Sequence, residues 1–170
     1  MSVSVQYNNG IFNTATHLIH LLEKIFGPIK RVRSEKKDAK NIKDPNISFI
    51  AYANRLPIFF EGVDNLKYRL FEIDMKFEKG RLMLSNDSLS EFKLVSGRGF
   101  TFLETCASSV NINMNRSLLD VYENIFQVMK QKKQASSDLS SAVQALLVAT
   151  KAIESAESGK LLNIWLCQKF

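Results

Sequence analysis

The stretch Gly10-Ile11-Phe12-Asn13-Thr14-Ala15-Thr16-His17-Leu18-Ile19-His20 decides how this 170-residue chain is interpreted. A glycine leads into a polar turn, and apolar side chains then recur with helical spacing, at Leu18, Leu21, Leu22 and Ile25. We expect a helix over residues 14–26, capped by Asn13 and ended by Gly27-Pro28. Because Asn13 and His17 are four residues apart, they share one side of the helix near its N-terminal end. An amide and an imidazole placed there can hold and deprotonate a hydroxyl group.

The middle of the chain is dominated by strand patterns. Between residues 68 and 85, apolar and charged side chains alternate, as in a strand with one buried face, the apolar ones being Phe71, Ile73, Met75 and Phe77. We expect Lys79-Gly80 to form a tight hairpin turn in which Gly80 has a positive φ. Further strands are expected over residues 29–33, 47–53, 57–62, 91–95, 100–104 and 161–165.

The C-terminal third carries two helical patterns. The first has an apolar stripe at Leu118, Tyr122, Ile125 and Met129, and the second runs over residues 138–158 and ends at Gly159. Strands that do not alternate with helices predict an α+β fold, with an open, mostly antiparallel sheet and helices packed on one face. Since residues 47–53 are apolar on both sides, the other sheet face is expected to pair with a second copy.

Composition predicts one globular domain over residues 1–170. The chain is 45% apolar and 24% charged, and no apolar run approaches the ~20 residues that span a bilayer. The N-terminus lacks the layout of a secretory signal, so a cytoplasmic location is expected. Cys106 and Cys167 have no metal-ligand spacing, and free thiols are favoured over a disulfide, which the sequence leaves open.

The net charge of +6 is concentrated in two runs, residues 30–43 and 130–133. Solvated strand ends and loops are the ordinary explanation, and a basic nucleic-acid-binding domain is the alternative. Neither run contains the interleaved aromatic residues that would favour the alternative. The chain also lacks the Gly-rich loops that bind dinucleotides or nucleotide phosphates.

Three blocks in one order along the chain are similar to a known family: residues 10–28, 71–82, and 117–126 with the helix that follows. In the first block Gly10, Asn13 and His17 match a Gly-rich turn, an Asp or Asn, and a His four residues later. At the end of the last helix, residues 152–160 are similar to a closing Glu-Ser-Ala followed by Gly-Lys. Together the blocks resemble the C-terminal domain of the Gfo/Idh/MocA family of NAD(P)-dependent oxidoreductases.

The resemblance implies a fold like the C-terminal domain of glyceraldehyde-3-phosphate dehydrogenase. In this family the N-terminal Rossmann domain binds NAD or NADP, and the C-terminal domain supplies much of the sugar or nucleotide-sugar pocket and the dimer interface. The Rossmann domain is absent from this chain, so the chain alone is expected to bind no cofactor and to have no dehydrogenase activity. A stand-alone, non-catalytic sugar-binding or dimerisation module is the alternative.

The resemblance also assigns residues. His17 corresponds to the catalytic histidine, and Asn13, Thr14 and Tyr122 are expected to bind substrate. Tyr122 also fits a core position on its apolar stripe. His20 stands where the family usually has Asp, and a His17–His20 metal pair is not expected, because no third ligand is evident.

Overall fold

A computed structural model describes residues 1–35, 43–64, 66–96, 99, 101–105, 110–111, 116–131 and 135–165. Cys106 and Cys167 lie outside the described residues, as does much of both basic runs. Within the described part of the chain, no helix is long and apolar enough to cross a membrane.

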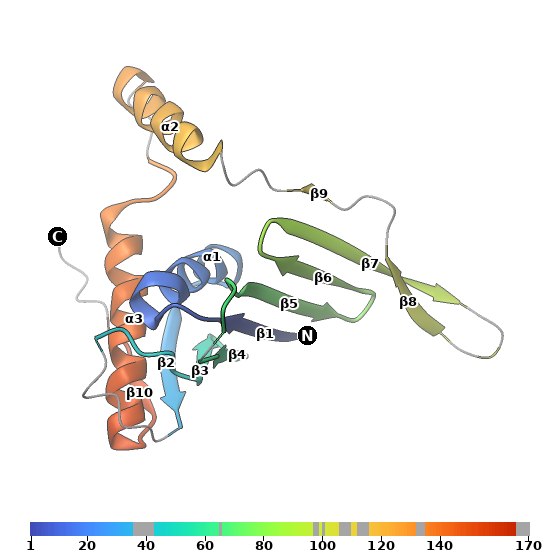
Figure 1. Cartoon of the computed structure of the whole chain (residues 1–170), viewed down its shortest axis with the longest axis horizontal. Coiled ribbons are helices and arrows are strands. Elements are labelled where there is room, and N and C mark those ends of the chain that lie inside the picture. The colour runs from blue at the N-terminus through green and yellow to red at the C-terminus, as the bar shows by residue number, and fades with distance from the viewer. Residues whose placement is uncertain are drawn as a thin grey trace.

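A ten-stranded sheet forms the centre of the molecule (Figure 1). Its strands are β1 (Ser2–Tyr7), β2 (Ile29–Ser34), β3 (Phe49–Ala53), β4 (Leu56–Gly62), β5 (Phe71–Phe77), β6 (Gly80–Ser85), β7 (Ser88–Ser96), β8 (Thr101–Thr105), β9 (Val110–Asn111) and β10 (Leu162–Asn163). The order is β10-β2-β3-β4-β1-β5-β6-β7-β8, with β9 beside β7. Only β1 and β4 pair in parallel among these strands, so the predicted open, mostly antiparallel sheet is confirmed.

Strand β1 is central, although the sequence analysis did not predict it. It lies between β4 and β5, and its alternate side chains Val3, Val5 and Tyr7 are fully buried. The Tyr7 hydroxyl donates to the Ile47 carbonyl at 2.7 Å and accepts from the Ile47 N–H at 3.0 Å. Apolar and polar side chains alternate along Ser2–Tyr7, and this period-two pattern is the feature of the sequence that indicates the strand.

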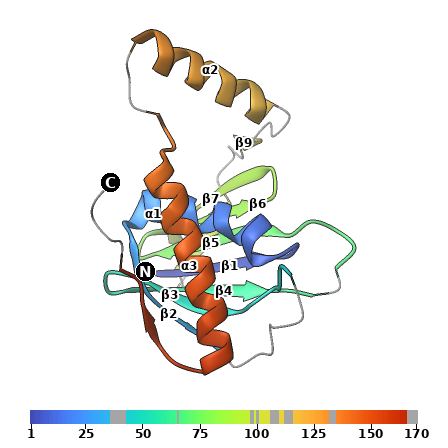
Figure 2. The same cartoon turned by 90° about the vertical axis from the view of Figure 1, so that its left-hand side faces the viewer.

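Two helices cover one face of the sheet (Figure 2). These are α1 (Thr16–Phe26), which follows a single π-helical turn η1 (Ile11–Ala15), and α3 (Leu139–Ser158). Helix α1 buries Leu18, Ile19 and Leu22, whereas Leu21 and Ile25 of the predicted stripe are exposed. Helix α3 faces the sheet with small side chains that allow close approach, at Ala145, Ala149, Ala152 and Ala156.

The third helix, α2 (Ser117–Gln131), does not join the other two on this face. It stands apart from the sheet body (Figure 1), and its apolar stripe is exposed, with Tyr122 at 68%. The core position that Tyr122 was also thought to fit is therefore wrong, because the described part of the chain does not cover the stripe.

The β5–β6 hairpin is confirmed, but the role of its glycine is not the predicted one. Residues 78 and 79 form the turn, Phe77 pairs with Gly80, and Gly80 has no positive φ. A Cβ on Gly80 would lie 2.7 Å from the Phe92 carbonyl oxygen of β7. The glycine therefore permits a close approach between strands rather than a left-handed turn.

Candidate functional site

The helix that presents His17 begins differently from the prediction. Its first turn is π-helical, with the Thr14 and Ala15 N–H groups both donating to the Gly10 carbonyl. Asn13 lies inside this turn and forms no cap, so its predicted capping role is wrong.

A loop that is distant in the sequence caps the helix instead. The Asp44 carboxylate accepts from the Phe12 N–H at 2.7 Å and from the Asn13 N–H at 3.1 Å. The Asn46 side-chain oxygen accepts from the Gly10 N–H at 2.8 Å. Nothing local in the sequence shows that the side chains of Asp44 and Asn46 reach back over thirty residues to this helix start.

This capping decides what the helix start can bind. The N–H groups of a helix N-terminus can hold a pyrophosphate, as in dinucleotide-binding folds. Here those of Phe12 and Asn13 are taken by a carboxylate, whose negative charge would repel a phosphate. This helix start therefore does not fit the pyrophosphate of a dinucleotide.

His17 and Asn13 lie on the outward side of the helix. Both are exposed, and exposed side chains continue the same four-residue spacing at Leu21 and Ile25. Neither Asn13 nor His17 forms a side-chain hydrogen bond within the described part of the chain, so both remain available to a ligand. Thr14, in contrast, is buried, which leaves little of its surface for the predicted substrate contact.

His20 occupies a different environment one turn further on. It lines a cavity of about 210 Å³ between α1 and the start of α3, together with Glu23, Ser141 and Gln144. Glu23 accepts from the Ile29 N–H at 2.9 Å and from Gln144 Nε2 at 3.1 Å. Burial raises the pKa of the Glu23 carboxyl above its ordinary value, and these hydrogen bonds oppose the shift only in part.

The predicted site residues are thus only partly brought together. Asn13 and His17 share one exposed surface, whereas Tyr122 lies on α2, away from α1 (Figure 1). The described residues hold no group of three or more His, Cys, Asp or Glu side chains that could bind a metal ion.

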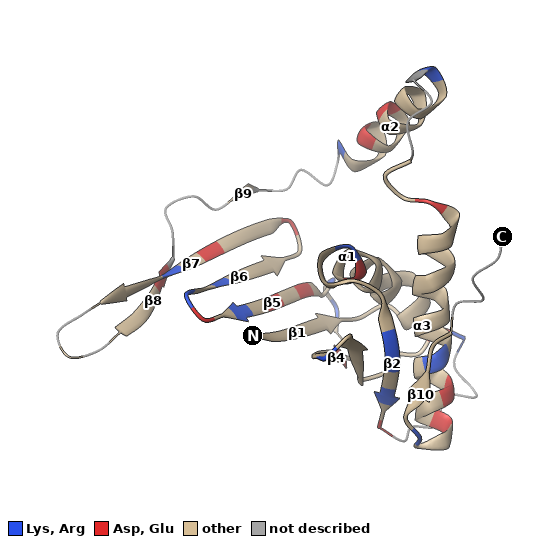
Figure 3. Cartoon of the chain, turned by 180° about the vertical axis from the view of Figure 1, so that it is seen from behind, with Lys and Arg blue, Asp and Glu red and all other residues tan. Residues whose placement is uncertain are grey.

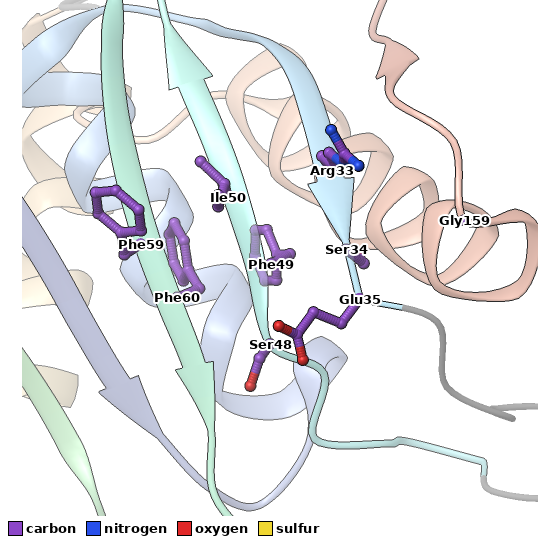
Figure 4. A pocket seen from close by; sticks show the side chains of 9 residues that line it. All are labelled: Arg33, Ser34, Glu35, Ser48, Phe49, Ile50, Phe59, Phe60 and Gly159. Atoms are coloured by element: carbon purple, nitrogen blue, oxygen red, sulfur yellow. The ribbon is translucent and has the colours of Figure 1, made fainter.

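The sheet face opposite the helices carries a second organised surface. In register across it lie Arg33, Ile50, Phe59, Ser4, Asp74 and Met83. Arg33, Ile50 and Phe59 also line a cavity of about 550 Å³, together with Phe49 and Phe60, whose rings stack at 4.4 Å (Figure 4). The face therefore carries Arg33 on β2, an apolar centre on β3 and β4, and on β5 an Asp74 that is ion-paired with Lys76 and Arg81.

The chain is similar in structure to sugar-modifying dehydrogenases. A comparison with protein-family models finds no match, and a comparison with curated protein sequences finds none either. Levoglucosan dehydrogenase in complex with NADH and levoglucosan matches 96% of this chain at a TM-score of 0.77 and 12% identity. A UDP-N-acetylglucosamine 3-dehydrogenase from Acidithiobacillus ferrooxidans matches 93% at a TM-score of 0.77 and 11% identity.

The match covers only part of each of these dehydrogenases. This chain spans 58% of the length of levoglucosan dehydrogenase and 55% of the length of the UDP-N-acetylglucosamine 3-dehydrogenase. At such low identity the likeness establishes the fold alone. The chain has the fold of the C-terminal domain of Gfo/Idh/MocA oxidoreductases, which is the fold that the sequence resemblance implied.

Proposed function

We propose that this chain is the substrate-binding and dimerisation domain of an NAD(P)-dependent sugar or nucleotide-sugar oxidoreductase. The observation that carries the proposal is the exposed, unengaged His17 at the start of α1, in a fold shared with dehydrogenases of this class. We place the nicotinamide cofactor of such an enzyme in a separate nucleotide-binding domain, as the family resemblance implies. The Asp44 carboxylate at the start of α1 agrees with this placement.

His17 supplies the acid–base part of this function. A neutral imidazole can accept the proton of a sugar hydroxyl when one ring nitrogen lies within hydrogen-bond reach. Asn13 can orient that hydroxyl through its amide but cannot serve as a base, because an amide has no accessible proton-accepting pKa. We therefore assign His17 the proton transfer and Asn13 the positioning of substrate.

The two histidines of the chain allow a sharp test, since each contributes one set of imidazole signals in an NMR spectrum. We expect a panel of free sugars and UDP-sugars to contain a ligand that shifts the His17 signals and leaves those of His20 nearly unchanged. Binding of that ligand should weaken at least tenfold in His17→Ala and remain within about twofold in His20→Ala. Equal perturbation of both histidines, or no response to any member of the panel, would refute the proposed function.

The open sheet face is assigned the dimer contact. Ile50 and Phe59 form its apolar centre, and Phe59 is 46% exposed although it lies in the middle of the sheet. Arg33 on β2 and the ion-paired Asp74 on β5 flank this centre on opposite sides. In Figure 3, β2 carries basic residues and β5 carries residues of both signs. A two-fold axis through the centre would bring the apolar side chains of Ile50 and Phe59 from the two copies together.

Sedimentation velocity tests this assignment with two phenylalanines of similar exposure. Phe59→Asp should convert a dimer into a monomer, because it places a charge in the apolar centre. Phe77→Asp is the control, since Phe77 is 41% exposed but lies at a strand end on the opposite side of the sheet. A monomeric wild-type chain, or a dimer that Phe77→Asp disrupts equally, would contradict the assignment.

A further inference from the structure

A second cavity, of about 790 Å³, lies at the opposite end of α1 from His17. It begins at Pro28, just after the last turn of α1, whereas His17 is in the first turn. The eleven residues of α1 span roughly 16 Å at the rise of an α-helix, so the two sites are separate. The volume falls within the range of roughly 300–1,000 Å³ typical of small-molecule sites.

Three cations line this cavity, and no acidic side chain does: they are Lys30, Arg31 and Arg55. A β-bulge between Ile29 and Arg31 interrupts the strand alternation, so the consecutive Lys30 and Arg31 both reach the cavity. None of the three forms an ion pair within the described part of the chain. Like charges gathered without a counter-charge favour an anionic ligand.

Aromatic residues accompany the cations, although the sequence run itself contains none. The Arg31 guanidinium lies over the Tyr52 ring at 5.0 Å, which holds it in place. Trp165, which follows β10, also lines the cavity and is 82% exposed. Neighbouring strands thus bring to residues 30–31 the flat apolar surfaces that ring-containing ligands stack on.

The polar side chain of Gln144 forms part of the wall of this cavity. Gln144 is buried and held by its Nε2, which donates to the Ile29 carbonyl at 3.0 Å and to Glu23. Its Oε1 is buried without a hydrogen-bond partner in the described structure. The amides of Asn54 and Asn163 add exposed polar groups at the rim.

We propose that this cavity binds a small phosphate-bearing molecule with a flat ring, such as a nucleoside monophosphate. The Arg31 and Arg55 guanidinium groups suit phosphate oxygens, which they can contact with paired N–H groups. The indole of Trp165 provides the stacking surface for the ring. The site is remote from His17, so this ligand is not the group that reacts there.

The fluorescence of Trp165 tests the proposal, because it is the only tryptophan in the chain. UMP should quench it saturably, and calorimetry should give the same affinity. Uridine and inorganic phosphate should each bind more weakly than UMP, because each lacks half of the recognised chemistry. Arg55→Ala should weaken UMP binding roughly tenfold or more, since it removes a charge-assisted hydrogen bond.

Arg69→Ala is the matched control, because it removes the same charge at an exposed position that does not line the cavity. It should leave the UMP affinity within about twofold. Equal weakening in both variants, uridine binding as tightly as UMP, or no calorimetric response to UMP would each overturn the proposal. Binding of oligouridylate without binding of UMP would also overturn it, in favour of a nucleic-acid surface. The histidine signals test the proposed function separately, so a failure here leaves that result unaffected.

Discussion

The sheet body and helix α2 were predicted from the same kind of pattern, yet they bury their apolar residues very differently. Leu18 of α1 is fully buried between the sheet and α3, whereas Leu118 of α2 is 70% exposed. Periodicity shows which residues share a face of a helix, but it does not show what covers that face. The apolar side chains of the sheet body are buried by other parts of the same chain, whereas the apolar stripe of α2 is not buried by any described part of it. Exposed apolar stripes of this kind are typical of interfaces.

Matched truncations of two leucines should give the largest difference between these regions. Leu18→Ala removes methyl groups from a packed core and should lower the free energy of unfolding by about 2–5 kcal/mol. Leu118→Ala should change it by less than about 0.5 kcal/mol, because the side chain is mostly solvated. Urea denaturation followed by circular dichroism measures both. A loss of comparable size in the two variants would show that α2 packs against the body in solution.

Two glycines with positive φ test how strongly the helix start in the body depends on the Asp44 loop. Gly10 has φ +96°, and a Cβ there would lie 2.1 Å from the Asp44 carboxyl carbon. Gly159 has φ +69° and open space around it. Gly159→Ala should cost about 1 kcal/mol from backbone strain alone, and Gly10→Ala should cost about 2–4 kcal/mol because the capping loop must also move.

The excess cost at Gly10 should depend on Asp44. In an Asp44→Ala background, Gly10→Ala should destabilise by clearly less than it does in the wild type, because the carboxylate no longer occupies the space. Some cost remains, because φ +96° and ψ 151° at Gly10 still strain an alanine. A double-mutant cycle by thermal or urea unfolding gives this coupling energy. Additive effects of the two substitutions would mean that the loop does not hold the helix start in solution.

Two serines donate hydrogen bonds of the same length to carbonyl groups of α3, but one bond is buried and the other is exposed. Ser34 Oγ donates to the Ala152 carbonyl and Ser158 Oγ to the Glu154 carbonyl, both at 2.7 Å. The Ser34 bond is buried between β2 and α3, and the Ser158 bond is exposed. Ser34→Ala should cost about 1–2 kcal/mol and Ser158→Ala less than about 0.5 kcal/mol in chemical unfolding. The opposite order would mean that water reaches the α3–β2 contact.

Much of the fold could be predicted because local patterns and tertiary packing agree. The β5–β6 hairpin alternates along its length, and α3 ends at Gly159, which adopts the expected left-handed conformation. Strand β1 carried the same alternation but was missed, since six residues at a chain end give only a short signal. A central strand can thus be less evident in sequence than a peripheral helix such as α2.

The candidate site could be predicted only in part for a related reason. The shared side of Asn13 and His17 follows from their four-residue spacing. Its exposure does not, because Leu21 and Ile25 continue this side and were expected in the apolar stripe. The capping of the same helix by Asp44 and Asn46 depends on a loop that folding brings back over it. The cavity at Arg55 and Trp165 likewise joins segments more than one hundred residues apart. Contacts of this kind depend on tertiary packing, and a single sequence does not encode them locally.

The pH dependence of stability should give the smallest effect, and it again reflects the packing of the body. Burial raises the pKa of Glu23 above its ordinary value of 4.5. Between 4.5 and the raised pKa, the folded chain therefore holds a proton that the unfolded chain has released. The stabilisation from this proton is fully present below pH 4.5 and is lost as the pH rises through the folded-state pKa.

Glu23→Gln removes the titration while keeping an oxygen for the Ile29 N–H. The unfolding free energy of the wild type relative to Glu23→Gln should accordingly fall as the pH is raised from below 4.5 through the folded-state pKa. Urea unfolding across this range measures the difference, with the exposed Glu61→Gln as the control for a lost negative charge. A difference that is flat with pH, or that rises, would mean that Glu23 is solvated and that water reaches the α1–α3 contact around Gln144.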